Sequence, residues 1–234
     1  MSHRYEVAVD GDVSARVLVA AVWADGIPSV AESLELEWLP ELLARAKHGE
    51  ELVSSDVRGE VRNMLRHGTY KPTGRGKPAS EFLMQAALRG EFPRINGPVD
   101  ANNAISLASG LPGSIFDGDL AGSPLFVRYG RAGESYVFNP SGQTIDLEDL
   151  VAVCRRVDGA WGPCGNPIKD SMTTKVHADT HRVVAILYVP RPFGHAVADR
   201  WAAQFSEALG SSCRARDAGH FLVTAAQDEA PGPA

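Results

Sequence analysis

The stretch from Lys71 to Asp117 constrains the fold more than any other part of the chain. Glycine and proline residues divide it into short segments of helical length and composition. One helix is expected from about Ala79 to Arg89, with Ser80 as its cap and Glu81 in its first turn. A second helix is expected to begin at Asp100 and run to about Ser109. Helices this short need a sheet or other helices against which to bury their apolar faces.

Strand-like runs flank this stretch on both sides. They are rich in Val and other β-formers and are bounded by Gly, Pro or Asp. We expect strands at Tyr5–Val9, Arg16–Trp23, Leu125–Tyr129, Glu134–Phe138, Val151–Val157, Val183–Val189, Ser212–Arg216 and Phe221–Ala225. The first two are expected to pair as a hairpin around Gly11-Asp12, and the third and fourth to form another hairpin.

Helical periodicity appears in three further places. Residues 29–47 predict two short helices or one broken at Pro40. Residues 54–56 offer N-caps for a helix that ends at Leu65. Apolar residues recur at helical spacing from His195 to Leu209 and predict an amphipathic helix. The pattern as a whole predicts one α+β domain over residues 1–225, with a mixed, mainly antiparallel sheet flanked by helices, and a disordered tail at 226–234.

Composition and cysteine spacing argue against a membrane protein, a disulfide-rich protein and a zinc protein. The 234 residues are 44% hydrophobic and 22% charged, which is ordinary for a globular protein. No apolar run is long enough to span a membrane and no signal-peptide layout opens the chain, so a cytoplasmic location is expected. The three cysteines lack the spacing of a disulfide framework or a zinc site. We expect reduced thiols, no metal and no cofactor.

Charge is distributed unevenly along the chain. The net charge is −6 overall, but residues 62–94 contain seven bases against two acids, whereas residues 25–60 contain nine acids against three bases. A basic band on an acidic body is typical of a protein that contacts phosphate at one place. A solvated surface with no partner is the alternative. The candidate phosphate-contacting bases are Arg75, Lys77, Arg94, Arg155 and Arg156.

The loop at residues 68–80 contains a Gly-Lys pair that superficially suggests a nucleotide-binding loop. A P-loop needs four residues between its glycines, a Ser or Thr after the lysine, and a preceding strand. The sequence TGRGKPAS has none of these. A Pro-bracketed loop that presents Arg75 and Lys77 is the better interpretation.

The segment PVDANNAISLASGLPGSIFD, at residues 98–117, resembles a segment of the B3/B4 domain of bacterial phenylalanyl-tRNA synthetase β subunits. The family pattern is P-V-D-V-T-N, an apolar run, and then G-Q-P-M-H-A-F-D. Matching positions include Val99, Asp100, Asn103, Gly110, Pro112, Phe116 and Asp117. The lead-in GRGKPASEFL is similar to that of free-standing B3/B4 proteins. The resemblance covers about residues 71–190.

The resemblance implies a pocket for a mischarged amino acid. Asn102 stands where the family has Thr, and Asn103 matches the family Asn, so both are expected to line this pocket. Two departures bear on its chemistry. Ser114 replaces the family histidine and so removes a group that titrates near neutral pH. Ile186 stands where the family motif has a glutamate.

Residues 159–167 form the second informative stretch. Their glycines and prolines predict a loop that approaches a ligand closely, and the resemblance implies that Gly162 and Gly165 contact the substrate amino acid. Cys164 lies between them and is a substrate-binding candidate, although no histidine partner for a nucleophilic thiol is evident. Asp170 follows at the exit of the loop. Asn103, Ser114 and Asp170 are the catalytic candidates.

Two functions from different classes remain open. The first is a free-standing editing-type domain that hydrolyses the aminoacyl ester of a mischarged tRNA, in which case the partner is the tRNA 3′ end. An aminoacyl ester is already activated, so the site need only position water and stabilise an oxyanion. The second is a non-catalytic module that binds an amino acid, an aminoacyl conjugate or a protein, possibly within a biosynthetic pathway. Loss of the family His and Glu favours the second.

Overall fold

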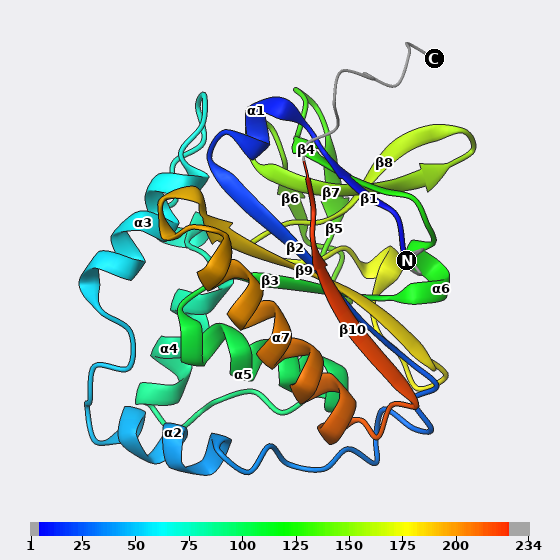
Figure 1. The fold of residues 1–234 in the computed structure, drawn as a ribbon. Coiled ribbons are helices and arrows are strands. Elements are labelled where there is room, and N and C mark those ends of the chain that lie inside the picture. Colours follow the sequence, from blue (N-terminus) through cyan, green and yellow to red (C-terminus); the bar gives the residue numbers. More distant parts are fainter. Residues whose placement is uncertain (1–4, 225–234) are drawn as a thin grey trace.

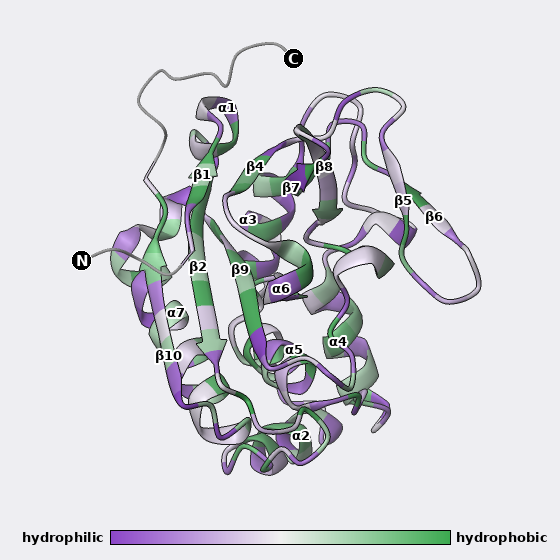
Figure 2. Cartoon of the chain, turned by 90° about the vertical axis from the view of Figure 1, so that its right-hand side faces the viewer, coloured by the Kyte–Doolittle hydropathy of each residue, from purple (hydrophilic) through white to green (hydrophobic). Residues whose placement is uncertain are grey.

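The structure, a computed structural model, describes residues 5–224 and has an α+β fold with mixed and antiparallel sheets. One four-stranded sheet has the order β10-β2-β9-β3, and a second has the order β1-β4-β7-β8. A two-stranded hairpin, β5–β6, projects beside them (Figure 2). The predicted fold class is therefore confirmed. Residues 225–234, which include the predicted tail and the end of the last predicted strand, lie outside the described residues.

The first sheet is built on the pairing of β2 (Val17–Asp25) with β9 (Arg182–Pro190). The two strands are antiparallel and in register over all nine residues. Eight of the nine residues of each strand are buried, because helices cover one face and the second sheet lies toward the other. A strand covered on both faces has a continuous apolar run rather than alternation, as the green colour of β2 and β9 shows in Figure 2. The edge strands are β3 (Gly113–Asp117) and β10 (Asp217–Leu222).

Helices are packed on one side of this sheet (Figure 1). The long helix α7 (His195–Ser212) contacts β2 and β10, and α5 (Gly97–Ser109) contacts α7 and β3. Behind α5 lies α4 (Ala79–Leu88), and α2 (Leu39–Lys47) packs against α4. The helix α3 (Ser55–Leu65) contacts β9. The helices expected over 55–65, 79–89, 100–109 and 195–209 are confirmed.

The second sheet contains the remaining long strands. Its members are β1 (Val7–Val9), β4 (Leu125–Tyr129), β7 (Val151–Val157) and β8 (Ala160–Gly165), and β1 and β4 are its parallel pair. The hairpin strands are β5 (Ser135–Val137) and β6 (Thr144–Asp146). Short helices complete the fold at α1 (Gly11–Ser14), α6 (Gly118–Ala121), η1 (Gly74–Gly76), η2 (Met172–Thr174) and η3 (Arg191–Phe193).

Both predicted hairpins are wrong. Asp10 caps the short helix α1 between the first two strands, and these strands then enter different sheets. Similarly, β4 pairs with β7, whereas β5 pairs with β6. Local turn residues indicated where the chain reverses, but long-range pairing between buried runs decided which strands meet.

Three other boundaries differ from the prediction. Residues 29–38 form no helix, and Asn96, not Asp100, is the N-cap of α5. Asp100 instead accepts the Ile95 N–H from within the first turn. The predicted strand at 212–216 is wrong because α7 continues to Ser212, where the Ser212 hydroxyl donates to the Ala208 carbonyl.

The expected glycine-rich loop at 159–167 is mostly the strand β8, so this prediction is also wrong. β8 pairs with β7, and a bulge between Val153 and Cys154 lets the chain turn toward the core. Gly165 is buried there for a packing reason. A Cβ at this position would lie 2.4 Å from the Phe116 ring and 2.7 Å from Asp170 Oδ1.

Replacing Gly165 therefore tests the packing between the two sheets. Gly165→Ala is expected to lower the free energy of unfolding by about 1–3 kcal/mol, because the added methyl group would overlap the fully buried Phe116 ring and the Asp170 carboxylate. Gly59→Ala is the matched control, since Gly59 lies in α3 with open space at its Cβ, and alanine there should add about 0.5–1 kcal/mol. Chemical denaturation measures both. Equal stability of Gly165→Ala and wild type would contradict this packing.

Candidate nucleic-acid interface

A surface groove lies between the β5–β6 hairpin and the loop before α4. Its volume is about 950 Å³. The loop contributes Lys71 and Arg75, the hairpin side contributes Phe138 and Gln143, and Lys169, which follows β8 in the chain, also lines the groove. Asp146 and Glu148 also line it. We call this surface the basic groove, after Lys71, Arg75 and Lys169.

Ion pairs decide which bases of the positive band remain free. Three are neutralised by acids, in the pairs Arg62–Glu81, Arg89–Glu91 and Arg94–Glu35. Among residues 5–224, no ion pair is formed by Lys71, Arg75 or Lys77, and none is formed by Lys169. The positive charge predicted for residues 62–94 is therefore concentrated at the loop that borders the groove.

Phe138 is the aromatic centre of the groove. The ammonium group of Lys169 lies 3.8 Å from the centroid of the Phe138 ring, and that of Lys175 donates to the Phe138 carbonyl at 3.2 Å. Burial lowers the pKa of Lys169, and the neighbouring Arg75 lowers it further. Like charges held together in this way, without a carboxylate partner, favour an anionic ligand.

The other predicted tRNA-binding residues lie elsewhere. Arg94 follows α4 and pairs with Glu35 near the helical end of the molecule. Arg155 donates to the Leu120 carbonyl, and Arg156 donates to the Gly159 carbonyl and stacks 4.1 Å over Trp161. Lys77 follows η1 and is half-buried. Only Arg75 of the five predicted bases lines the basic groove.

A buried polar cluster lies behind the groove, and Asn166 organises it. Asn166 Oδ1 accepts the N–H groups of Ile168 at 2.7 Å and Lys169 at 2.9 Å, which turns the chain toward the groove. Its Nδ2 donates to the hydroxyl of Tyr136, which in turn donates to the Lys169 carbonyl at 2.7 Å. The turn that presents Lys169 is therefore fixed on both sides.

Ser114 belongs to the same cluster and has no access to solvent. Its hydroxyl donates to the Asn166 carbonyl at 3.1 Å and lies 2.9 Å from the hydroxyl of the fully buried Tyr188. Ser114 is the register partner of Ile186 in the β3–β9 pair. The two positions that depart from the family pattern therefore meet in space, and the side chains there are packed in the core.

Asp170 joins this cluster to the edge of the sheet. Its Oδ2 accepts the Ile115 N–H of β3 at 3.1 Å, whereas its Oδ1 is inaccessible to solvent and is without a hydrogen-bond partner in the part of the chain that the structure describes. Burial raises the pKa of Asp170 to about 7, and nearby hydrogen bonds oppose that rise only in part. Of the three predicted catalytic residues, Asp170 is thus the one with a pKa near neutral pH.

The two predicted asparagines lie on α5, and Asn102 contacts β3 at Gly113. Asn102 Nδ2 donates to the Gly113 carbonyl at 3.4 Å, and its Oδ1 occupies the space toward which a Gly113 side chain would point. Ser114 points to the opposite face, because side chains alternate along a strand. Asn103 is half-buried on α5, and no hydrogen bond of its amide is found among residues 5–224. The structure does not bring Asn102 and Ser114 into one pocket.

The substrate-binding candidates on β8 are also enclosed. Cys164 is fully buried, and burial raises the pKa of its thiol far above the ordinary value. A buried, protonated thiol is unsuited to nucleophilic attack. Gly165 packs against Phe116, and Gly162 faces Val157 in the strand pair. Their expected contact with a ligand stays a prediction.

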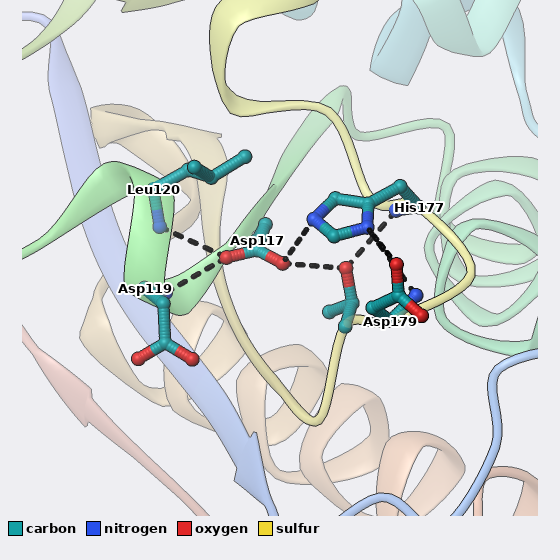
Figure 3. A network of polar contacts seen from close by, with 6 residues as sticks. Asp117, Asp119, Leu120, His177 and Asp179 are labelled. Atoms are coloured by element: carbon teal, nitrogen blue, oxygen red, sulfur yellow. Dashed lines mark hydrogen bonds and ion pairs between the residues drawn. The ribbon is translucent and has the colours of Figure 1, made fainter.

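A second polar network lies at the far end of β3 (Figure 3). Asp117 caps α6 through the N–H groups of Asp119 and Leu120, and its other oxygen accepts from the Thr180 hydroxyl. His177 Nε2 lies 3.3 Å from the same oxygen, while its Nδ1 accepts the Asp179 N–H at 3.3 Å. Both nitrogens of this histidine are therefore engaged, and the network is structural. Over residues 5–224, no group of three or more potential ligands could hold a metal ion.

Sequence reasoning missed Lys169, Phe138, Tyr136 and Tyr188. Lys169 and Phe138 are far apart in the chain and carry no motif, so only the fold brings them together. A signal for Asn166 was present, since Asn followed by Pro often organises a turn.

Within the described part of the chain, no helix is long and apolar enough to cross a membrane.

Comparison with known proteins identifies one family. The family model described as the B3/4 domain matches residues 71–202. Among solved structures, the chain is similar to an N-terminal fragment of the phenylalanyl-tRNA synthetase β-subunit from Pyrococcus horikoshii, with 12% identity and a TM-score of 0.45. That match covers 94% of this chain and 51% of the other, so the chain spans about half the length of that fragment. No curated protein matches.

The raised pKa of Asp170 predicts a pH dependence of stability. Between about pH 4 and pH 7 the folded protein retains a proton at Asp170 that the unfolded chain has released. The contribution of Asp170 to the free energy of unfolding is thus fully present below about pH 4 and is lost as the pH rises toward 7. In Asp170→Asn, the decline across that window should be smaller, as measured by denaturation at a series of pH values.

Asp158→Asn is the control, because Asp158 is exposed at a turn and should leave the profile unchanged. If Asp170→Asn has the same pH profile as wild type, Asp170 is ionised in the folded protein and its assignment as a near-neutral titrating group is wrong.

Proposed function

Since the chain belongs to the B3/4 domain family, we propose that it binds the aminoacylated 3′ end of a tRNA in the basic groove and hydrolyses the aminoacyl ester of mischarged tRNA. The observation that carries this proposal is the convergence on one groove of Lys71, Arg75 and Lys169, which form no ion pair within residues 5–224. Phosphate groups are the ligands that such a set of free cations favours.

The groove has room and chemistry for a terminal nucleotide. Its volume of about 950 Å³ exceeds the need of one nucleoside, and the cation–π pair of Phe138 and Lys169 lines it beside Arg75. Lys71 and Arg75 come from a loop fixed by Tyr70, whose hydroxyl donates to the Gly76 carbonyl. A fixed loop holds its cations in place before the ligand arrives, which reduces the entropy cost of binding.

The hydrolytic step makes modest demands on the protein. An aminoacyl ester needs an oriented carbonyl, a positioned water molecule and hydrogen-bond donors for the oxyanion, and the ribose hydroxyl beside the ester can assist. In the groove, the Nε2 amide of Gln143 and the hydroxyl of Thr144 are polar groups that can orient the ester and water. Asp146 and Glu148 supply carboxylates in the same groove.

A second function is favoured by a different observation. Two of the three predicted catalytic residues are enclosed, since Ser114 is fully buried and Oδ1 of Asp170 is inaccessible to solvent. The predicted substrate-binding residue Cys164 is also fully buried, whereas Asn103 is half-buried. This arrangement supports a non-catalytic module that retains the groove as a binding site for an amino acid or aminoacyl conjugate. The two functions predict the same dependence on Arg75 but differ in turnover.

The test combines turnover with binding. Wild-type protein is expected to release amino acid from at least one member of a panel of mischarged tRNAs faster than buffer does. Arg75→Gln/Lys169→Gln should raise KM about tenfold or more, because two phosphate contacts are lost, with a smaller change in kcat. Arg89→Gln/Arg94→Gln removes the same charge from bases that are already paired with acids, and it should behave as wild type.

The outcomes separate the two functions. tRNA binding that depends on Arg75 and Lys169, without turnover for any substrate, selects the non-catalytic module. If wild type neither binds nor deacylates tRNA, or if both double variants lose affinity equally, the basic groove is not a tRNA site.

A further inference from the structure

A second cavity, lined mainly by basic residues, opens beside the basic groove. Its volume is about 400 Å³, and its lining residues are Arg16, Arg66, His67, Gly68, Tyr70 and Lys71. Among residues 5–224, no acid lines it. Arg16 precedes β2 and Arg66 follows α3, so two distant parts of the chain bring their guanidinium groups to one place.

The walls of this cavity are held by specific contacts. Arg16 Nη1 donates to the Arg66 carbonyl at 2.7 Å, and Arg66 Nη1 donates to Asn63 Oδ1 at 2.6 Å. The His67 ring stacks on Tyr129, with ring centroids 3.6 Å apart and planes at 5°. Each guanidinium uses only part of its set of five donors in these contacts, so each retains donors for a ligand.

Nearby carboxylates do not cancel the charge. Asp149, which is close to His67, accepts the N–H of Thr69 at 2.6 Å and its hydroxyl at 2.9 Å, so its carboxylate is turned to the loop backbone. Asp10 and Asp12 also lie near Tyr129, where the Asp10 carboxylate accepts the Asp12 N–H as the N-cap of α1. Within residues 5–224, neither Arg16 nor Arg66 forms an ion pair.

Tyr70 and Lys71 line both this cavity and the basic groove, so the two form one continuous surface. We propose that the cavity is a second phosphate-binding subsite, which holds the single-stranded backbone of an RNA 5′ to the terminal nucleotide in the basic groove. This inference rests on the proposed function, since it needs RNA in the groove. Arginine suits this role because its planar fork binds phosphate oxygens in pairs.

Two subsites in series predict that affinity depends on RNA length. An oligonucleotide just long enough to fill the groove contacts Lys71, Arg75 and Lys169. One with the same 3′ end and several more nucleotides also reaches Arg16 and Arg66. Each added phosphate contact steepens the dependence of affinity on salt by about 0.7 in the log–log plot for a single strand.

The experiment measures affinity of the full chain for a short and a long single-stranded RNA that share the CCA 3′ end. For wild type, the long RNA should bind about tenfold more tightly and with the steeper salt slope. Arg16→Gln/Arg66→Gln should lose that advantage for the long RNA and bind the short RNA within about twofold of wild type. Arg89→Gln/Arg94→Gln controls for the loss of two positive charges, and melting temperatures establish that each variant folds.

The results separate this inference from the proposed function. If wild type binds both RNAs through Arg75 but Arg16→Gln/Arg66→Gln retains the advantage of the long RNA, the second subsite is wrong and the groove assignment stands. If wild type binds neither RNA, both are wrong. Should the Arg16 change unfold the protein, Arg66→Gln alone, at an exposed position, is expected to show half the effect on the salt slope, and an unchanged slope overturns the subsite.

Discussion

The side chain of Asn166 fixes the turn on which the candidate site depends. Its oxygen accepts two backbone N–H groups, its nitrogen donates to Tyr136, and its own carbonyl accepts from Ser114. The chain leaves this turn with Lys169 directed to the groove and Asp170 bound to the edge of β3. One buried amide thus connects the core of the central sheet to the surface where charge collects. Such a network is rigid because an unsatisfied buried partner costs about 1–3 kcal/mol.

Local sequence signals predicted the helices and most strands, but not their partners. Ser54 and the apolar positions after it were sufficient to place α3, and the continuous Val-rich run placed β9. The glycine-rich run at 159–167 predicted a loop, but most of it is the strand β8. Gly165 is required there for close packing, because a side chain at this position would meet the Phe116 ring. A glycine that serves close packing has the same sequence signal as one that serves a turn, and only the neighbour distinguishes them.

The candidate site was predicted only in part for a related reason. Counting charges along the chain located a basic band, but pairing decided which of its members are free. Arg94 is neutralised by Glu35, whereas Arg75 is joined by Lys169, which is distant in sequence. The family resemblance singled out Ser114 and Ile186 as two departures from the family pattern, and the structure shows that they are register partners. It could not foresee that Tyr188 would fill the space beside them, because that depends on the packing of two sheets.

We therefore propose that the ligand binds at the surface groove and that the enclosed family positions support its walls. Hydrogen exchange of backbone amides, with and without an aminoacyl-tRNA, tests this claim most directly. The expected result is slower exchange at residues 66–77 and 138–146 and at Lys169, with little change in α2 and α7. Protection confined to α2 and α7, or to the β7–β8 tip around Arg156, would contradict it.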